Sequence, residues 1–229
     1  MKVFIPIKTE SQRVNGKNFR TLSSKKLYQR VIDKVSTGFL RDWSVYVDTD
    51  SDEIIDYCRD IHNVTAYRRL ETLEGNEVSV CNLIDHFIRE FEIIGPVCQV
   101  HTTTPFLKPK TLKNAYRMFN KGYDSVVSCT EFKTRFWRYE DSYNSYAPIN
   151  HNPARLEQTQ DLPPYYEENS AFYMFYAEDF IMSKMRIGLN PYFFKLSFPE
   201  NMDIDTEDDW KLVELYETSN NYYYAIRFT

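Results

Sequence analysis

Short apolar runs alternate with segments of helical spacing along most of this 229-residue chain. The apolar runs that predict buried strands are 2–7, 43–47, 97–100, 123–129, 171–176 and 193–198. The segments that predict helices are 27–38, 51–61, 76–92, 110–120 and 207–217. Because parallel strands covered by helices read as short apolar runs, this alternation indicates an α/β protein with a mostly parallel sheet.

Residues 130–165 interrupt this alternation. They are rich in Tyr, Asn, Arg and Pro and show no helical period. A structureless loop of that length is uncommon inside a compact domain, so we expect an arm or small sheet that packs on a partner subunit or covers a cleft. Since no repeat or linker-like stretch is visible, residues 1–229 are expected to form a single domain that carries this arm.

Glycine is scarce. The chain has 6 glycines, whereas average usage would give roughly 16. Neither GxGxxG nor GxxxxGK[ST] occurs, which argues against the usual dinucleotide-binding and P-loop folds. If this chain binds nucleotide phosphates, side chains must take over the role of a glycine-rich backbone.

Charge and cysteine usage restrict the partners and the compartment. A net charge of −5 argues against nucleic acid and anionic membranes as partners. The apolar run Val3–Ile7 is too short for the core of a signal peptide, and no run approaches the ~18 residues of a membrane span. No CxxC and no GxSxG occurs. The four cysteines, which we expect to be buried free thiols in a reducing cytoplasm, are Cys58, Cys81, Cys98 and Cys129.

The loop at residues 8–18 directly follows the first predicted strand. In α/β sheets the carboxyl ends of the strands form the edge that binds ligands. Cations with hydroxyl and amide groups at this edge can hold a triphosphate, although a solvated basic loop is the alternative. The candidate phosphate-binding residues are Lys8, Ser11, Gln12, Arg13, Lys17 and Asn18.

Two aspartates precede the last predicted helix. Asp203 and Asp205 are separated by one residue, so in extended backbone both side chains lie on one side. Such a pair suits Mg²⁺ that also binds a phosphate. The alternative is a helix N-terminus with Thr206 or Asp205 as its cap, and both interpretations can hold together.

Further polar segments flank predicted strands. Residues 101–104 follow the strand at 97–100, and residues 166–170 lead into the strand at 171–176. Side chains there can contact a substrate, but taken alone the first segment is better explained as a turn that ends at Pro105, and the alternative for the second is an ordinary strand entry. The pair at 68–69, Arg-Arg, can bind an anion or lie solvated on the surface.

Taken in order, these motifs resemble the cytidylyltransferases that activate nonulosonic acids, the CMP-sialic acid synthetase family. The first match is IPIKTESQRVNGKN at residues 5–18, and the last is DIDTEDD at residues 203–209. Six segments match in the family's order across nearly the whole chain. The other four are DTDS at 48–51, residues 69–79, VHTTTPFL at 100–107 and NSAFY at 169–173.

The resemblance implies a Rossmann-like, GT-A-like nucleotidyltransferase fold and a homodimer in which the arm at 130–165 is exchanged. It implies that CTP and a nonulosonic acid give a CMP-sugar and pyrophosphate, with Mg²⁺ as the cofactor held by Asp203 and Asp205. It assigns catalytic roles to those two aspartates and to Lys8, Arg13 and Lys17. The nucleotide-binding residues would be Lys8, Ser11, Gln12, Arg13, Lys17, Asn18, Arg69 and Ser79. The sugar-binding residues would be His101, Thr104, Arg155, Gln158, Tyr166 and Asn169, with an arginine such as Arg155 pairing with the sugar carboxylate.

The chain departs from the family pattern at four positions. Lys8 replaces an arginine, Gln12 a lysine, His101 a glutamine and Ser170 a glycine. The first two remove hydrogen-bonding capacity or charge from the triphosphate site, and the last two alter the sugar pocket. The sequence therefore leaves three alternatives open: a relative that uses another sugar such as Kdo, a weakened homologue that only binds nucleotide or sugar, and a glycosyltransferase with an Asp-x-Asp motif.

Overall fold

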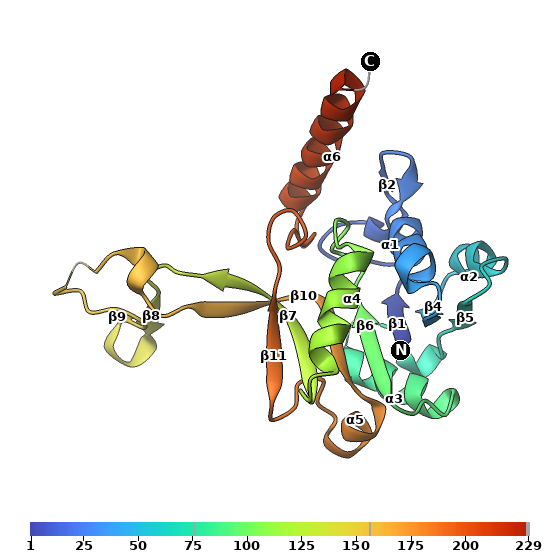
Figure 1. Cartoon of the computed structure of the whole chain (residues 1–229), viewed down its shortest axis with the longest axis horizontal. Helices are drawn as coiled ribbons and strands as arrows, with labels where there is room; N and C mark the ends of the chain where they lie inside the picture. Colours follow the sequence, from blue (N-terminus) through green and yellow to red (C-terminus); the bar gives the residue numbers. More distant parts are fainter. Residues whose placement is uncertain (76, 156, 228–229) are drawn as a thin grey trace.

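The central strands are short and apolar because helices cover both faces of the sheet that they form. The computed structural model describes residues 1–75, 77–155 and 157–227. Within this part, seven strands pair in the order β11-β7-β10-β6-β1-β4-β5 (Figure 1), and only β10 runs antiparallel to its neighbours. The seven are β1 Lys2–Ile7, β4 Ser44–Thr49, β5 Val64–Arg68, β6 Pro96–Val100, β7 Ser125–Phe132, β10 Tyr165–Tyr176 and β11 Pro191–Lys195. The predicted mostly parallel α/β sheet is confirmed.

Helices pack on both faces of the sheet, and each face has its own hydrophobic core. On one face α1 Leu27–Ser36, α2 Asp52–Cys58 and α4 Pro109–Phe119 contribute side chains to the larger core. On the other face α3 Val80–Glu90 and α5 Ala177–Ser183 pack around buried phenylalanines such as Phe87. The apolar faces predicted from helical spacing are therefore the faces that contact the sheet.

Several predicted boundaries are wrong. The α3 helix begins at Val80 rather than 76, since Ser79 caps it by accepting a hydrogen bond from the Asn82 amide at 3.3 Å; residue 76 lies outside the described residues. The α2 helix ends at Cys58 rather than 61. The β11 strand is 191–195 rather than 193–198. The β5 strand and the α5 helix were not predicted.

The segment at 130–165 forms a protrusion built on two long strands. Beyond the sheet, β7 and β10 continue as an antiparallel pair, with Tyr165 opposite Phe132. Figure 1 shows this arm extending to one side of the body, with β8 Trp137–Glu140 and β9 Ser145–Pro148 paired near its end. The remaining short elements are η1 Lys17–Phe19, β2 Thr21–Leu22, β3 Lys25–Lys26, η2 Gly38–Leu40, η3 Glu71–Leu73, η4 Asp141–Tyr143 and η5 Thr159–Asp161.

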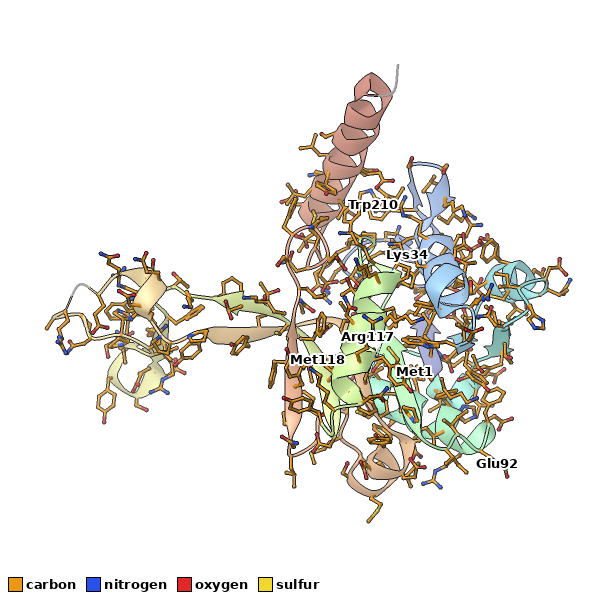
Figure 2. The ribbon with its side chains drawn as sticks, viewed as in Figure 1. Met1, Lys34, Glu92, Arg117, Met118 and Trp210 are labelled. Atoms are coloured by element: carbon orange, nitrogen blue, oxygen red, sulfur yellow. The ribbon has the colours of Figure 1, made fainter. Side chains whose placement is uncertain are left out.

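The last helix, α6 Glu207–Arg227, extends away from the body (Figure 1) and is anchored at its first turns. Trp210 and Val213 are buried there against Val14 and Leu27, which places the start of α6 beside the first loop (Figure 2). Across residues 1–75, 77–155 and 157–227, no helix combines the length and hydrophobicity that crossing a membrane requires.

The four cysteines are free thiols, as predicted. Cys58, Cys98 and Cys129 are buried, and burial raises the pKa of the Cys129 thiol to about 11. Cys81 is only partly buried, which corrects the expectation that all four lie in the core.

Lys34 on α1 is a partly buried lysine whose charged end is enclosed. The ammonium nitrogen of Lys34 (Figure 2) has no hydrogen-bond partner among the described residues. Nearby, Arg30 donates two hydrogen bonds to the Glu217 carboxylate on α6, at 2.8 and 3.1 Å. This carboxylate is therefore already paired with an arginine. Burial, followed by the charge of Arg30, lowers the pKa of Lys34 from 10.5 to about 7.

We expect Lys34→Met to raise the free energy of unfolding by about 2 kcal/mol at pH 7. Between pH 7 and 10.5 the unfolded chain binds more protons at Lys34 than the folded chain, so the wild type gains stability as the pH rises. The advantage of the variant should therefore shrink toward pH 10. Urea unfolding at pH 6.5 and pH 9.5 measures it, and an advantage independent of pH would contradict this account.

Candidate active site

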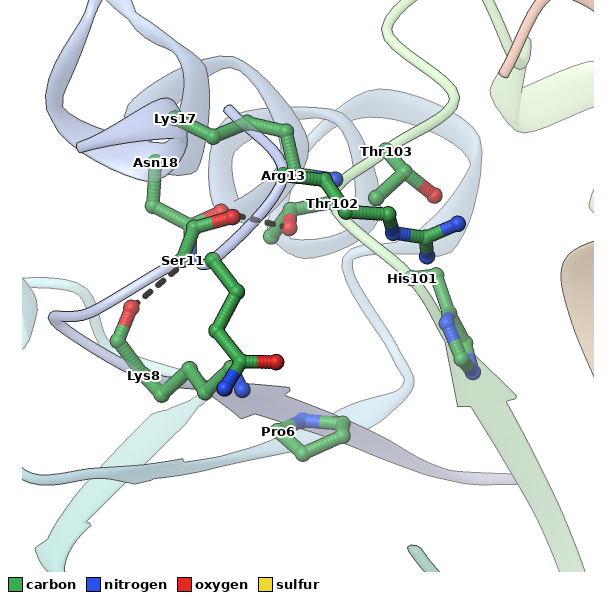
Figure 3. Close-up of a pocket in the computed structure, with 10 residues that line it drawn as sticks. Pro6, Lys8, Ser11, Arg13, Lys17, Asn18, His101, Thr102 and Thr103 are labelled. Carbon is green, nitrogen blue, oxygen red and sulfur yellow. Dashed lines mark hydrogen bonds between the residues drawn. The ribbon is translucent and has the colours of Figure 1, made fainter. Parts of the chain in front are cut away.

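A cavity of about 310 Å³ opens at the carboxyl ends of β1 and β6 (Figure 3). Two further openings adjoin it at Lys8, with volumes of about 380 and 190 Å³, and Arg69 lines both. All three lie at the sheet edge where parallel strands end, which is the usual ligand site of α/β folds. The residues that line the first-loop cavity, the one of about 310 Å³, are Pro6, Lys8, Ser11, Gln12, Arg13, Lys17, Asn18, His101, Thr102 and Thr103.

The first loop is held against the end of β6 by Asn18. The buried Asn18 side chain donates to the carbonyl of Lys8 at 2.9 Å and accepts from the Thr102 hydroxyl at 2.7 Å (Figure 3). The loop turns at Gly16, whose φ of 60° lies in the left-handed region that glycine adopts without strain. These contacts fold the loop so that its cations line one cavity.

Lys17 connects the first loop to the segment that precedes α6. Its side chain is 8% exposed, and its ammonium donates to the carbonyl of Ile204 at 2.5 Å. Burial lowers the pKa of Lys17, while the charges of Asp203 and Asp205 oppose that effect. The lysine therefore lies within the field of both aspartates.

The aspartate pair faces the same loop. Asp205 forms an ion pair with Arg13 at 2.7 Å, and both side chains are largely exposed. Asp203 is more enclosed, its Oδ1 has no partner among the described residues, and burial raises its pKa. An enclosed carboxylate oxygen without a donor is suited to a cation, and the donor set of two carboxylates fits Mg²⁺ that shares ligands with a phosphate.

The start of α6 also forms a helix cap. The Asp209 carboxylate accepts from the Thr206 amide at 2.7 Å, and the Thr206 hydroxyl accepts from the Asp209 amide at 3.2 Å. This reciprocal pair is the capping box that was weighed against a metal site. Since it uses the side chains of Thr206 and Asp209, the cap does not occupy the carboxylates of Asp203 and Asp205.

Arg69 lies in a buried ion pair. Its guanidinium donates to the Asp48 carboxylate, and the two side chains are 5% and 0% exposed. The interpretation of 68–69 as a solvated pair is therefore wrong for Arg69. This residue directly follows β5, and its side chain reaches Asp48 on the neighbouring strand β4. Burial raises the pKa of Asp48, and the Arg69 charge opposes that shift. Arg69 thus lines the two adjoining openings while it also connects β5 to β4.

His101 lies at the boundary between the cavity and the sheet. Burial, followed by the charges of Arg186 and Lys17, lowers its pKa to about 4, so the imidazole is neutral at pH 7. The side-chain amide nitrogen of Gln99 lies 2.6 Å from its Nε2. Because a glutamine amide nitrogen can only donate, the ring nitrogen accepts this bond.

The remaining predicted residues do not line the first-loop cavity. Thr104 is buried and its hydroxyl has no partner within the described part of the chain. Asn169 is buried and donates to Thr130 at 3.2 Å, and Ser79 caps α3. Three of the predicted sugar-binding residues are exposed on the arm or at its base. They are Arg155, Gln158 and Tyr166.

Sequence reasoning missed three side chains beside His101. Gln99 is fully buried in β6, Tyr173 is buried in β10, and Arg186 follows α5. A glutamine within the apolar run at 97–100 was the one available signal, since an interior amide needs a partner. The contacts of Arg186 depend on the tertiary fold.

Ser170 adopts a backbone conformation that suits glycine. Its φ is 56°, at an irregularity in the pairing of β10 with β7. Its hydroxyl lies 3.3 Å from the Tyr173 hydroxyl. The position where the chain departs from the family's glycine is therefore strained.

We expect Ser170→Gly to raise the free energy of unfolding by about 0.5–1 kcal/mol, because glycine adopts positive φ without strain. Ser170→Ala is the matched control: it removes the hydroxyl but keeps the strain, so it should not stabilise. Urea denaturation of the three proteins distinguishes them. Equal stability of the two variants would show that the backbone conformation is not the cause.

The fold and the cavity define a class of protein. A mostly parallel sheet ends in a loop of cations that faces two aspartates, without a glycine-rich phosphate loop, which is an arrangement for nucleotidyl transfer. The family described as cytidylyltransferase matches residues 3–228, and the chain belongs to this family.

Curated relatives agree with the resemblance drawn from the motifs. N-acylneuraminate cytidylyltransferase A of Danio rerio is 28% identical over 174 residues, which are 75% of this chain and 40% of that protein. The chain thus spans less than half of that relative. CMP-N,N'-diacetyllegionaminic acid synthase of Legionella pneumophila is 28% identical over 224 residues, covering 92% of this chain and 93% of the relative.

A solved structure shares the fold. CMP:2-keto-3-deoxy-manno-octonic acid synthetase, solved in complex with CTP, superposes with a TM-score of 0.61 at 12% identity. The match covers 95% of this chain and 98% of that one. The expected nucleotidyltransferase fold is therefore confirmed.

Proposed function

We propose that this chain is a CMP-sugar synthetase that transfers the cytidylyl group of CTP to a nonulosonic acid of the sialic or legionaminic type. The observation that carries the proposal is the single cavity lined by Lys8, Arg13 and Lys17 and faced by Asp205. A relative matching 93% of its own length makes the CMP-derivative of such an acid.

The reaction needs positioning and charge neutralisation more than covalent chemistry by the protein. The anomeric hydroxyl oxygen bonds to the α-phosphorus, the bond to the pyrophosphate oxygen breaks, and the hydroxyl proton leaves to solvent. Lys8, Arg13 and Lys17 offset the charge of the triphosphate, and the Ser11 hydroxyl donates to it. Gln12 takes part as a neutral donor, where a lysine would add charge.

Asp203 and Asp205 would hold Mg²⁺. When bound, the ion would neutralise phosphate oxygens that develop charge as pyrophosphate leaves. Arg13 is 68% exposed and pairs with Asp205, so a phosphate can replace the carboxylate as its partner. Lys17 is buried and donates to the Ile204 carbonyl, so its ammonium would keep its position when a phosphate binds.

We expect pyrophosphate release when the protein is given CTP, Mg²⁺ and a panel that contains N-acetylneuraminic, diacetyllegionaminic and Kdo acids. Mass spectrometry identifies the CMP-sugar, and EDTA should stop the reaction until Mg²⁺ is restored. Asp205→Asn should lower kcat at least about 100-fold, because it halves the carboxylate charge of the proposed metal site.

Asp208→Asn is the matched control, since Asp208 is exposed at the start of α6 and pairs with Lys211 on the same helix. It should retain activity. If Asp205→Asn loses thermal stability in proportion to activity, the residue serves the helix and not the reaction. If CTP binds but no acid is converted, a nucleotide-binding subunit is the better description.

We also propose that the arm mediates a homodimer. Its end exposes large aromatic side chains, including Tyr143 at 77% and Tyr146 at 70%. A two-stranded hairpin with exposed aromatics has little stability of its own, so a second copy is a fitting cover. Exchange of arms would bring Arg155, Gln158 and Tyr166 to the partner's cavity, where they would contact the sugar.

Light scattering should give twice the chain mass, and Tyr146→Glu should shift the protein toward the monomer because a carboxylate disfavours an apolar interface. Met182→Glu is the control, since Met182 is 88% exposed on α5 outside the arm. A wild-type monomer at all concentrations would overturn the dimer. The same shift in both variants would indicate a general loss of association.

The proposed location is the cytoplasm. CTP is an intracellular nucleotide, and the free thiols Cys58, Cys81, Cys98 and Cys129 suit a reducing compartment. No nucleic acid or membrane partner is proposed, in keeping with the net charge of −5.

A further inference from the structure

Gln99, His101 and Tyr173 lie on one face of the sheet, next to the first-loop cavity. Gln99 and His101 are two residues apart at the end of β6, so in extended backbone their side chains lie on the same side. Tyr173 on β10 is directly opposite Gln99 in the pairing of these antiparallel strands. Gln99 is fully buried, and an amide in such a position needs partners for both its oxygen and its nitrogen.

Arg186 determines which way the Gln99 amide faces. One terminal nitrogen of its guanidinium donates to the side-chain oxygen of Gln99 at 3.0 Å. Because a guanidinium has only donors, turning the amide round would set two donors against each other. The guanidinium itself lies 3.9 Å from the centre of the Tyr173 ring, whose hydroxyl donates to Glu168 at 3.0 Å. Stacking and the hydrogen bond together hold Arg186, and through it the amide, in one orientation.

The orientation of this amide fixes the tautomer of His101. The Gln99 amide nitrogen lies 2.6 Å from Nε2 of His101, and since this nitrogen donates, Nε2 carries no hydrogen. The imidazole is neutral at pH 7, because burial, followed by the charges of Arg186 and Lys17, lowers its pKa to about 4. A neutral ring without hydrogen on Nε2 carries it on Nδ1. At Nδ1, His101 is therefore an uncharged donor that cannot accept.

His101 lines the first-loop cavity (Figure 3) and also the adjoining opening of about 190 Å³. Its Nε2 is occupied by Gln99, so the Nδ1–H group is the one that remains for a ligand. Arg186 lines a different opening, beside Asp124 and Asp179, so its link to the first-loop cavity passes through Gln99.

We infer that Gln99 and Arg186 are positioning residues that fix His101 as a donor to an uncharged acceptor oxygen of the sugar acid; this inference rests on the proposed function. The cations of the first loop suit phosphates, whereas a neutral donor suits a hydroxyl or carbonyl oxygen. The glutamine of the family pattern can both donate and accept at this position, but His101 in this tautomer only donates to the ligand. The site therefore selects for an acceptor group at that point of the sugar.

Nitrogen-15 spectra of the histidine rings test the tautomer directly in the whole chain. The chain has four histidines, and the signals missing from His101→Gln identify those of His101. At pH 7 the wild type should show a neutral His101 ring with its hydrogen on Nδ1. Gln99→Glu places a carboxylate, which only accepts, beside Nε2, so Nε2 should carry a hydrogen in that variant. Arg186→Met frees the Gln99 amide to turn, so both tautomers should be populated.

Kinetics test whether Gln99 acts through His101. His101→Leu should raise KM for the sugar acid about 3- to 10-fold, the effect of losing one neutral hydrogen bond, and leave KM for CTP unchanged. Gln99→Glu should raise the same KM to a similar extent. Combined with His101→Leu it should have no additional effect, because the residue through which it acts is gone. His101→Gln keeps a donor and should retain a KM close to that of the wild type.

Arg117→Met is the matched control for Arg186→Met, because Arg117 is exposed on α4 and does not line the cavity (Figure 2). It should leave the His101 tautomer and both KM values unchanged. Gln99→Glu introduces a charge into a buried strand, and if that variant does not fold, Arg186→Met still tests the tautomer.

The outcomes separate this inference from the proposed function. A wild type that converts no acid would contradict the proposed function and with it the sugar contact, while the spectra would still decide whether Gln99 fixes the ring. If acids are converted, hydrogen on Nε2 in the wild type or an unchanged tautomer in Gln99→Glu would overturn the inference. A rise in KM for CTP instead of the acid, or additive effects of Gln99→Glu and His101→Leu, would overturn it as well.

Discussion

A hydrogen bond between segments 187 residues apart holds the candidate site together: the Lys17 ammonium donates to the Ile204 carbonyl. It joins the loop after β1 to the segment before α6, and Arg13 reinforces the link through Asp205. The buried Trp210 then anchors α6 beside Val14, so packing supports the same connection. Because the loop supplies cations and the distant segment supplies carboxylates, the proposed phosphate and metal site requires both parts.

The low glycine content is consistent with a site in which side chains, and not backbone amides, supply the positive charge. A glycine-rich loop binds phosphate through backbone amides at a helix N-terminus. Here the loop after β1 contains Gly16 where the chain must turn with positive φ, and it carries its positive charge on side chains. Ser170 shows the opposite case, since a residue other than glycine stays in the left-handed region while its hydroxyl lies next to Tyr173. At these two positions the local backbone, and not overall composition, determines whether glycine is needed.

The sequence predicted those parts of the fold that depend on local patterns. Strand β1 and helix α4 were found because their apolar residues follow the expected periods and face a core. Strand β5 was missed because it lies at the sheet edge, where only half-buried residues alternate with exposed ones over five positions. The first loop was singled out because it directly follows a predicted strand, and the two aspartates because they are separated by one residue before a predicted helix. Arg69 was interpreted as a solvated residue, and Arg186 was missed. Both depend on tertiary contacts, because their partners Asp48 and Gln99 come from other strands.

Net charge and local charge act in opposite directions in this protein. The whole chain carries −5, which disfavours polyanions. Within the site, Lys8, Arg13 and Lys17 line one cavity, and Arg186 lies behind His101. Charges on partly buried side chains are screened far less by salt than those on the surface, so the local field at the sheet edge outweighs the diffuse negative charge at short range. A small, highly charged nucleotide fits entirely within this positive field. A long polyanion extends beyond it and is repelled by the acidic surface. The triphosphate and the sugar acid of the proposed reaction would therefore meet a positive field at one edge of the sheet, although the net charge of the chain is negative.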